Sequence, residues 1–151
     1  MLYFVSKKTY QLYKLNLNEF TYTTTSTKDN LFGDGEFTNS PDQIIRGKGG
    51  NVIYLTEDGG NSLGVYAINK KNKRYSIFEA YSDTYHGDET TGLAFSPDGK
   101  KMYACFQDCG CDSSNDIDFT CGCLLEFFRE DGRSFDGSTM SLKFHGVTQY
   151  V

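Results

Sequence analysis

The chain has 151 residues and a formal net charge of −5, and its 11 Tyr and 12 Phe stand beside 16 Gly and only 2 Pro. This length is sufficient for one domain with a buried core. The negative charge argues against a nucleic-acid partner, because binding a phosphate backbone requires clustered Lys and Arg. No apolar run approaches the ~18 residues of a membrane span, so we expect no transmembrane segment.

Aromatic and β-branched side chains suit a pleated sheet, and no stretch has a sustained helical apolar period. The sequence therefore predicts an all-β protein with almost no helix. The first strands are expected at residues 2–6, 10–16 and 19–23. The apolar start is too short for a signal peptide and no small-residue cleavage site follows it, so we expect natural sequence to precede Met1.

Two further groups of strands follow the polar stretch 23–39. We expect strands at residues 42–45, 52–56, 64–69 and 75–79, and then at 91–95, 101–106, 124–129 and 141–144. The sequence Ser-Pro-Asp-Gly at 96–99 predicts a type I turn, since Pro presets φ and Gly closes the turn. We assign this turn a structural role only.

Three similar segments, Leu-Tyr-Phe at 2–4, Ile-Tyr-Leu at 53–55 and Met-Tyr-Ala at 102–104, recur in the chain. A repeat of roughly 50 residues with about four strands is typical of a β-propeller blade. We therefore predict that residues 1–151 form a single β-propeller segment, with blade-like units at about 2–24, 42–80 and 89–145.

Three blades do not close a propeller, because natural rings have roughly four to eight. The predicted propeller is thus incomplete, or completed by the rest of a larger chain or by a partner chain. A single open antiparallel β-sandwich is the alternative architecture.

Four of the five cysteines form two Cys-Gly-Cys segments, Cys109 with Cys111 and Cys121 with Cys123, around an acidic loop. Two interpretations stay open. Disulfides between the segments would indicate an oxidising compartment, whereas four thiolates could bind a metal ion. The fifth cysteine, Cys105, lies in an apolar strand and is expected to be a buried free thiol.

Carboxylates stand at the ends of two predicted strands. Glu57 and Asp58 precede Gly59 and Gly60, and the pair Asp88 and Glu89 precedes the strand at 91–95. Carboxylate oxygens are the ligands that hard cations such as Ca²⁺ prefer, and glycines let the backbone bend around an ion. Each pair by itself is a weak signal, because such pairs in turns are usually solvated.

The motifs together are more specific. Ser-Pro-Asp-Gln-Ile at 40–44, Thr-Glu-Asp-Gly-Gly at 56–60 and Glu-Thr-Thr-Gly-Leu-Ala-Phe-Ser-Pro-Asp-Gly at 89–99 follow one another in this order. This series resembles the PhoX-type alkaline phosphatase family, from residue 2 to about residue 107, the C-terminal portion of the family pattern. The resemblance implies a secreted six-bladed propeller that binds calcium and iron through carboxylates.

Position by position, the resemblance implies that Glu57, Asp58, Glu89 and Asp42 are metal ligands. It implies hydrolysis of phosphate esters by metal ions that polarise the phosphoryl oxygen, and no catalytic side chain is assigned. The sequence departs from the family pattern at Gln43, at Thr56 and in the cysteine loop.

A second function stays open: a non-catalytic extracellular or lumenal propeller with structural calcium that binds another protein. His86 has two interpretations: contact with phosphate or a metal, or an ordinary hydrogen bond of a loop histidine, which is favoured. His145 is assigned no role.

Overall fold

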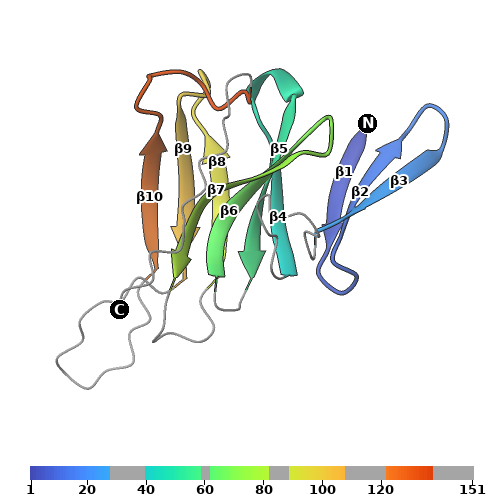
Figure 1. The fold of residues 1–151 in the computed structure, drawn as a ribbon, viewed down its shortest axis with the longest axis horizontal. Coiled ribbons are helices and arrows are strands. Elements are labelled where there is room, and N and C mark those ends of the chain that lie inside the picture. The colour runs from blue at the N-terminus through green and yellow to red at the C-terminus, as the bar shows by residue number, and fades with distance from the viewer. Residues whose placement is uncertain (28–39, 59–61, 82–88, 108–121, 138–151) are drawn as a thin grey trace.

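The computed structural model describes residues 1–27, 40–58, 62–81, 89–107 and 122–137 (Figure 1). Within these ranges the chain is all-β, as predicted, and the one helical element is a short 3-10 turn, η1 (Lys48–Gly50). No helix in this part of the chain is long and apolar enough to cross a membrane. The strand expected at residues 141–144 lies outside the described ranges.

The strands form three antiparallel sheets. The first sheet has the order β1-β2-β3, the middle sheet β4-β5-β6-β7 and the third sheet β10-β9-β8. The strands are β1 (Leu2–Ser6), β2 (Gln11–Asn16), β3 (Thr21–Ser26), β4 (Ser40–Arg46), β5 (Val52–Asp58), β6 (Ser62–Asn69), β7 (Arg74–Tyr81), β8 (Thr90–Phe95), β9 (Lys101–Phe106) and β10 (Cys123–Phe128).

The middle sheet is buried on both faces, which explains the uninterrupted apolar runs of β5 and β6. Successive side chains of a strand point to opposite faces. On β5, Val52 and Tyr54 join a core shared with the third sheet, whereas Ile53 and Leu55 join a second core shared with the first sheet. β6 divides in the same way, so a strand with two buried faces has no polar side to alternate with.

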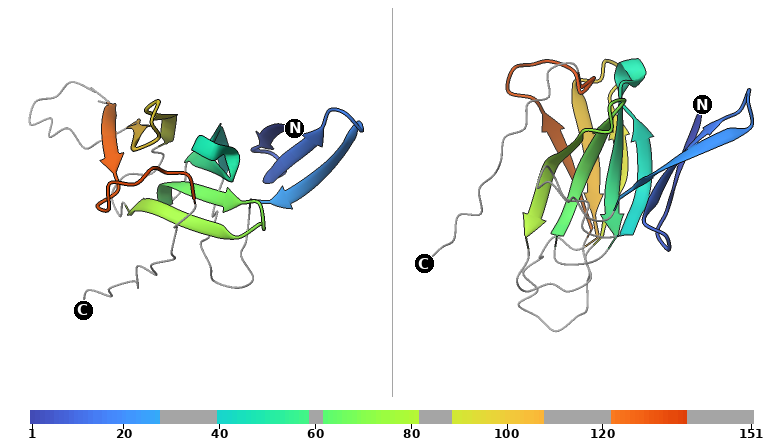
Figure 2. Two further views of the ribbon diagram at one scale, coloured as in Figure 1. Left: turned by 90° about the horizontal axis from the view of Figure 1, so that it is seen from above. Right: turned by 45° about the vertical axis from the view of Figure 1, so that its right-hand side comes forward.

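The three sheets lie face to face, with the middle sheet between the other two (Figure 2). Their first strands are neighbours, because β4 contacts β1 on one side and β8 on the other. The described residues form a stack of three sheets that does not close into a ring. The propeller therefore stays a prediction.

Tight turns join the strands at one end of the stack, which we call the turn end. The links at residues 47–51, 69–73 and 96–100 lie there, and the turn at 129–132, which follows β10, lies at the same end. In the predicted turn at 96–99, the Gly99 amide donates to the Ser96 carbonyl at 2.8 Å, and Gly99 has φ of 71°. The turn residues thus satisfy the backbone where the chain reverses, which confirms the structural role of this motif.

The segment after β10 returns over the turn end and closes the core. Phe135 is buried between the middle and third sheets, and its carbonyl accepts a hydrogen bond from the Tyr54 hydroxyl at 2.8 Å. Its amide donates to the Gly99 carbonyl. Burial raises the pKa of the Tyr54 hydroxyl well above its ordinary value.

Candidate metal centre

The predicted metal ligands come to the same end of neighbouring sheets, opposite the turn end. We call it the carboxylate end: β4, β6, β8 and β10 begin there, and β5, β7 and β9 end there (Figure 1). The register places Pro41 opposite Glu57 at the end of β5. Glu89 immediately precedes β8, whose first residue pairs with the last residue of β9. Two of the three motifs that carry carboxylates therefore meet at the start of β4 and the end of β5.

Glu57 is almost completely buried, with only 1% of its surface exposed. It follows Leu55 by two positions on β5, so alternation directs it toward the first sheet. An ionised carboxylate is rarely buried to this extent unless a cation or a metal compensates its charge. Among the predicted ligands whose side chains the structure describes, Glu57 is the most deeply buried. The side chain of Asp58 lies outside the description.

Asp42 makes an ion pair with the first sheet. Its Oδ1 atom lies 2.7 Å from the Nζ atom of Lys7, which follows β1. The Asp42 side chain retains 20% of its exposure and the Lys7 side chain 44%. This pair joins the first and middle sheets at the carboxylate end and involves one of the two oxygens of a carboxylate that the resemblance implies as a metal ligand.

Gln43 joins the middle and third sheets at the same end. Its Nε2 atom donates to Thr91 Oγ1 at 2.6 Å, and its Oε1 atom accepts from the Gly92 amide at 2.9 Å. Its own amide donates to Thr56 Oγ1 at 3.1 Å. One side chain therefore fixes the starts of β4 and β8 relative to each other, between Thr56, which precedes Glu57, and the segment that follows Glu89.

Thr90 is a polar residue that the sequence did not single out. It is fully buried, and its hydroxyl has no hydrogen-bond partner among the described residues. Thr90 pairs with Phe106, a core residue, which places the Thr90 side chain on the face toward the middle sheet. A buried hydroxyl oxygen without a partner is an available ligand for a hard cation.

The ligand set is incomplete in the described part of the chain. Those residues contain no group of three or more His, Cys, Asp or Glu side chains placed to hold a metal ion. Alternation also directs Glu57 and Thr90 into different layers, one on each side of the middle sheet. The oxygens of Glu57, Glu89 and Thr90 are each of a kind that calcium binds, but the described residues do not bring these three side chains together in one site.

Most of the cysteines that the sequence singled out lie outside the described residues, namely Cys109, Cys111, Cys121 and the side chain of Cys123. The two histidines, His86 and His145, lie outside them as well. Cys105 is a free thiol, but it is only half-buried rather than buried. It alternates with the core residues Met102 and Ala104 on β9, and therefore lies on the face of the third sheet that no other described sheet covers.

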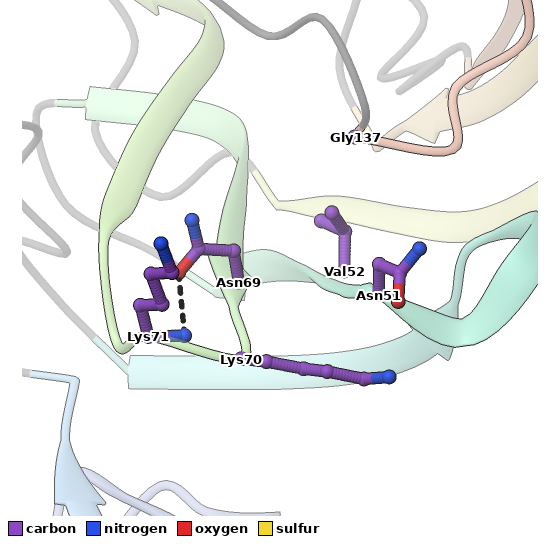
Figure 3. Close-up of a pocket in the computed structure, with 6 residues that line it drawn as sticks. All are labelled: Asn51, Val52, Asn69, Lys70, Lys71 and Gly137. Carbon is purple, nitrogen blue, oxygen red and sulfur yellow. Dashed lines mark hydrogen bonds between the residues drawn. The ribbon is translucent and has the colours of Figure 1, made fainter.

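A pocket of about 310 Å³ lies at the turn end, away from these carboxylates (Figure 3). Asn69 Oδ1 accepts hydrogen bonds from the Lys71 and Lys73 amides, both at 2.9 Å, so this side chain stabilises the turn. The lining contains no acidic residue and consists of Asn51, Val52, Asn69, Lys70, Lys71 and Gly137.

Comparison of the chain with protein-family models, with curated proteins and with solved structures found no match. The function is therefore argued from the residues and their arrangement.

Proposed function

We propose that this chain is the C-terminal, three-blade part of a secreted β-propeller of the PhoX-type phosphatase kind. Its carboxylate end binds calcium, and iron in addition, through Glu57 and Glu89. The remaining blades come from the rest of the propeller or from a partner chain, and the complete ring hydrolyses phosphate esters. The compartment is extracellular or lumenal, where Cys109, Cys111, Cys121 and Cys123 form disulfides.

The observation that carries this proposal is the burial of Glu57. Glu57 is a carboxylate that is 1% exposed at a strand end, at a position where the resemblance implies a ligand for a divalent cation. Glu89, the second predicted ligand, stands at the same end of the stack, immediately before β8.

The described residues have three roles in this function. Glu57 and Glu89 hold the cations, and Gln43 sets the spacing of the strands that carry them through its bonds to Thr91 and Gly92. The packed layers on both sides of the middle sheet exclude water from beneath the site. When bound, the metal ions supply Lewis acidity toward a phosphoryl oxygen.

The ion pair of Asp42 favours a second function. Since Lys7 holds one oxygen of this carboxylate, the number of free ligands is smaller than the resemblance implies. The second candidate is accordingly a non-catalytic propeller that retains structural calcium and binds another protein.

Metal analysis and a hydrolysis assay separate the two functions. Natively purified protein is measured for calcium, iron and zinc and then assayed with a phosphate monoester. The phosphatase predicts calcium with iron, and hydrolysis by the complete propeller that Glu89→Gln abolishes and the matched exposed variant Glu130→Gln retains. Calcium without iron and without hydrolysis supports the binding propeller, and absence of calcium contradicts both.

A further inference from the structure

The outer face of the first sheet is an exposed aromatic surface. Leu2 is 48% exposed, Phe4 43% and Tyr22 66%. The Phe4 and Tyr13 rings stack with centroids 4.7 Å apart and planes 2° apart, and the Tyr13 and Tyr22 centroids lie 6.2 Å apart. The strand positions on this face carry no charged side chain. A continuous apolar surface of this kind marks an interaction site.

The outer face of the third sheet is apolar as well. On β10, Leu124 is 63% exposed and Phe128 74%. They pair with Cys105 and Lys101, whose β9 positions alternate with core residues, so both lie on the uncovered face. Lys101 and Glu126, two opposite charges on this face, form an ion pair at 3.0 Å and balance each other.

The two outer faces are the two halves of one repeating interface. The repeat aligns Tyr3, Tyr54 and Tyr103, on strands that run in the same direction. Tyr3 packs toward the middle sheet and Tyr54 packs toward the third sheet, so the side chain at this position of the repeat faces the next sheet along the chain. Tyr103 holds the same position in the third sheet, and its side chain lies on the face that no other described sheet covers.

The complementary positions face the preceding sheet. Ile53 and Leu55 pack toward the first sheet, and Met102 and Ala104 pack toward the middle sheet. Leu2 and Phe4 hold the same places in the first sheet and lie on its exposed face. The outer face of the first sheet therefore corresponds to the face on which a preceding sheet packs. The outer face of the third sheet corresponds to the face on which a following sheet packs.

We infer that the remaining blades come from a partner chain and that this partner is a second copy of the chain. The two copies pack head to tail: the outer face of the first sheet of each copy packs on the outer face of the third sheet of the other. The interface continues the packing between the sheets within the chain. Two such interfaces related by a twofold axis close a ring of six sheets, within the roughly four to eight of natural propellers. The inference rests on the stacking that supports the proposed propeller and is independent of its metal site.

Solution mass tests the inference with the 151-residue chain. Light scattering after size exclusion is expected to give twice the 17.0 kDa mass of the chain. Tyr22→Lys changes the first-sheet face and Phe128→Lys the third-sheet face, and both side chains are exposed enough for the fold to tolerate the change. Each variant alone is expected to weaken dimerisation at least about tenfold, because every interface of its dimer contains the new charge. Leu17→Lys, at an exposed position between β2 and β3, is the matched control and leaves the dimer intact.

Mixing the two variants tests the head-to-tail geometry. A mixture of Tyr22→Lys and Phe128→Lys contains heterodimers in which one of the two interfaces is wholly wild type, so mixing restores dimers that neither variant forms alone. Circular dichroism of each variant verifies that it is folded. Monomeric wild type, a dimer that either variant leaves unchanged, or a mass that grows beyond two copies would each overturn the inference. A calcium titration is scored separately, so its failure is distinguishable from failure of the dimer.

Discussion

Gln43 is the residue that most directly sets the carboxylate end. Both polar atoms of its side-chain amide form hydrogen bonds with β8: the nitrogen donates to Thr91 and the oxygen accepts from Gly92. In the sequence, Gln43 is visible only as a departure from the family pattern. A bridge between two strands far apart in the chain has no local signature, so its partners could not be predicted.

Gln43→Leu is expected to lower the free energy of unfolding by about 1 kcal/mol, because the Gly92 amide and the Thr91 hydroxyl lose their partner and water replaces it only in part. Urea denaturation measures the change. Gln107→Leu, at an exposed position, is the control. Equal effects of the two substitutions would show that the bridge contributes nothing.

Tyr54 makes stability depend on alkaline pH. Burial raises the pKa of its hydroxyl above the ordinary value of about 10 that the unfolded chain retains. Above that pH the unfolded chain releases a proton that the folded chain keeps, so the free energy of unfolding falls as pH rises, and the contribution is fully present below pH about 10. Tyr54→Phe is expected to show a shallower fall above that pH than the wild type in denaturant titrations. If the free energies of unfolding of the wild type and of Tyr54→Phe fall in parallel above pH about 10, this account is contradicted.

Strand positions were largely predictable from the sequence, and strand ends were not. Lys101–Phe106 was expected with its observed bounds, whereas β4 and β7 extend beyond the expected ranges. Aromatic and β-branched runs identify the middle of a strand, while its ends depend on cross-strand partners. The division of the apolar run in β5 between two cores also required the structure, because the run itself has no alternation.

Gly64 permits the irregular pairing of β6 with β7. A Cβ atom added there would lie 2.5 Å from the Phe78 carbonyl oxygen, next to the register shift between Val65 and Tyr66. Gly64→Ala is therefore expected to lower the free energy of unfolding by about 2 kcal/mol. In the matched control, Gly122→Ala, the nearest atom lies at an ordinary 3.4 Å. Thermal or urea unfolding that ranks the two variants equally would refute the steric argument.

At the scale of the whole molecule, three sheets share two cores and bring separate carboxylate motifs to one end. The repeat at Tyr3, Tyr54 and Tyr103 predicted three similar units, and the three sheets occupy residues 2–26, 40–81 and 90–128. Whether the units close into a ring was beyond the sequence, because closure depends on contacts with further sheets. The candidate site was predictable to the level of residue type: carboxylates at strand ends are visible, whereas the buried hydroxyl of Thr90 and the Asp42–Lys7 pair emerge only when the sheets stack.

Calcium titration by isothermal calorimetry tests the central claim, that the carboxylate end is a cation site, most directly. The wild type is expected to bind calcium, and Glu57→Gln to weaken binding at least about tenfold, because the substitution removes a buried anionic ligand and changes little in size. Glu130→Gln, an exposed turn residue, is expected to bind as the wild type does. Wild-type protein that binds no calcium, or a Glu57→Gln variant that binds it equally well, would contradict the claim and leave Glu57 as a structural carboxylate of the core.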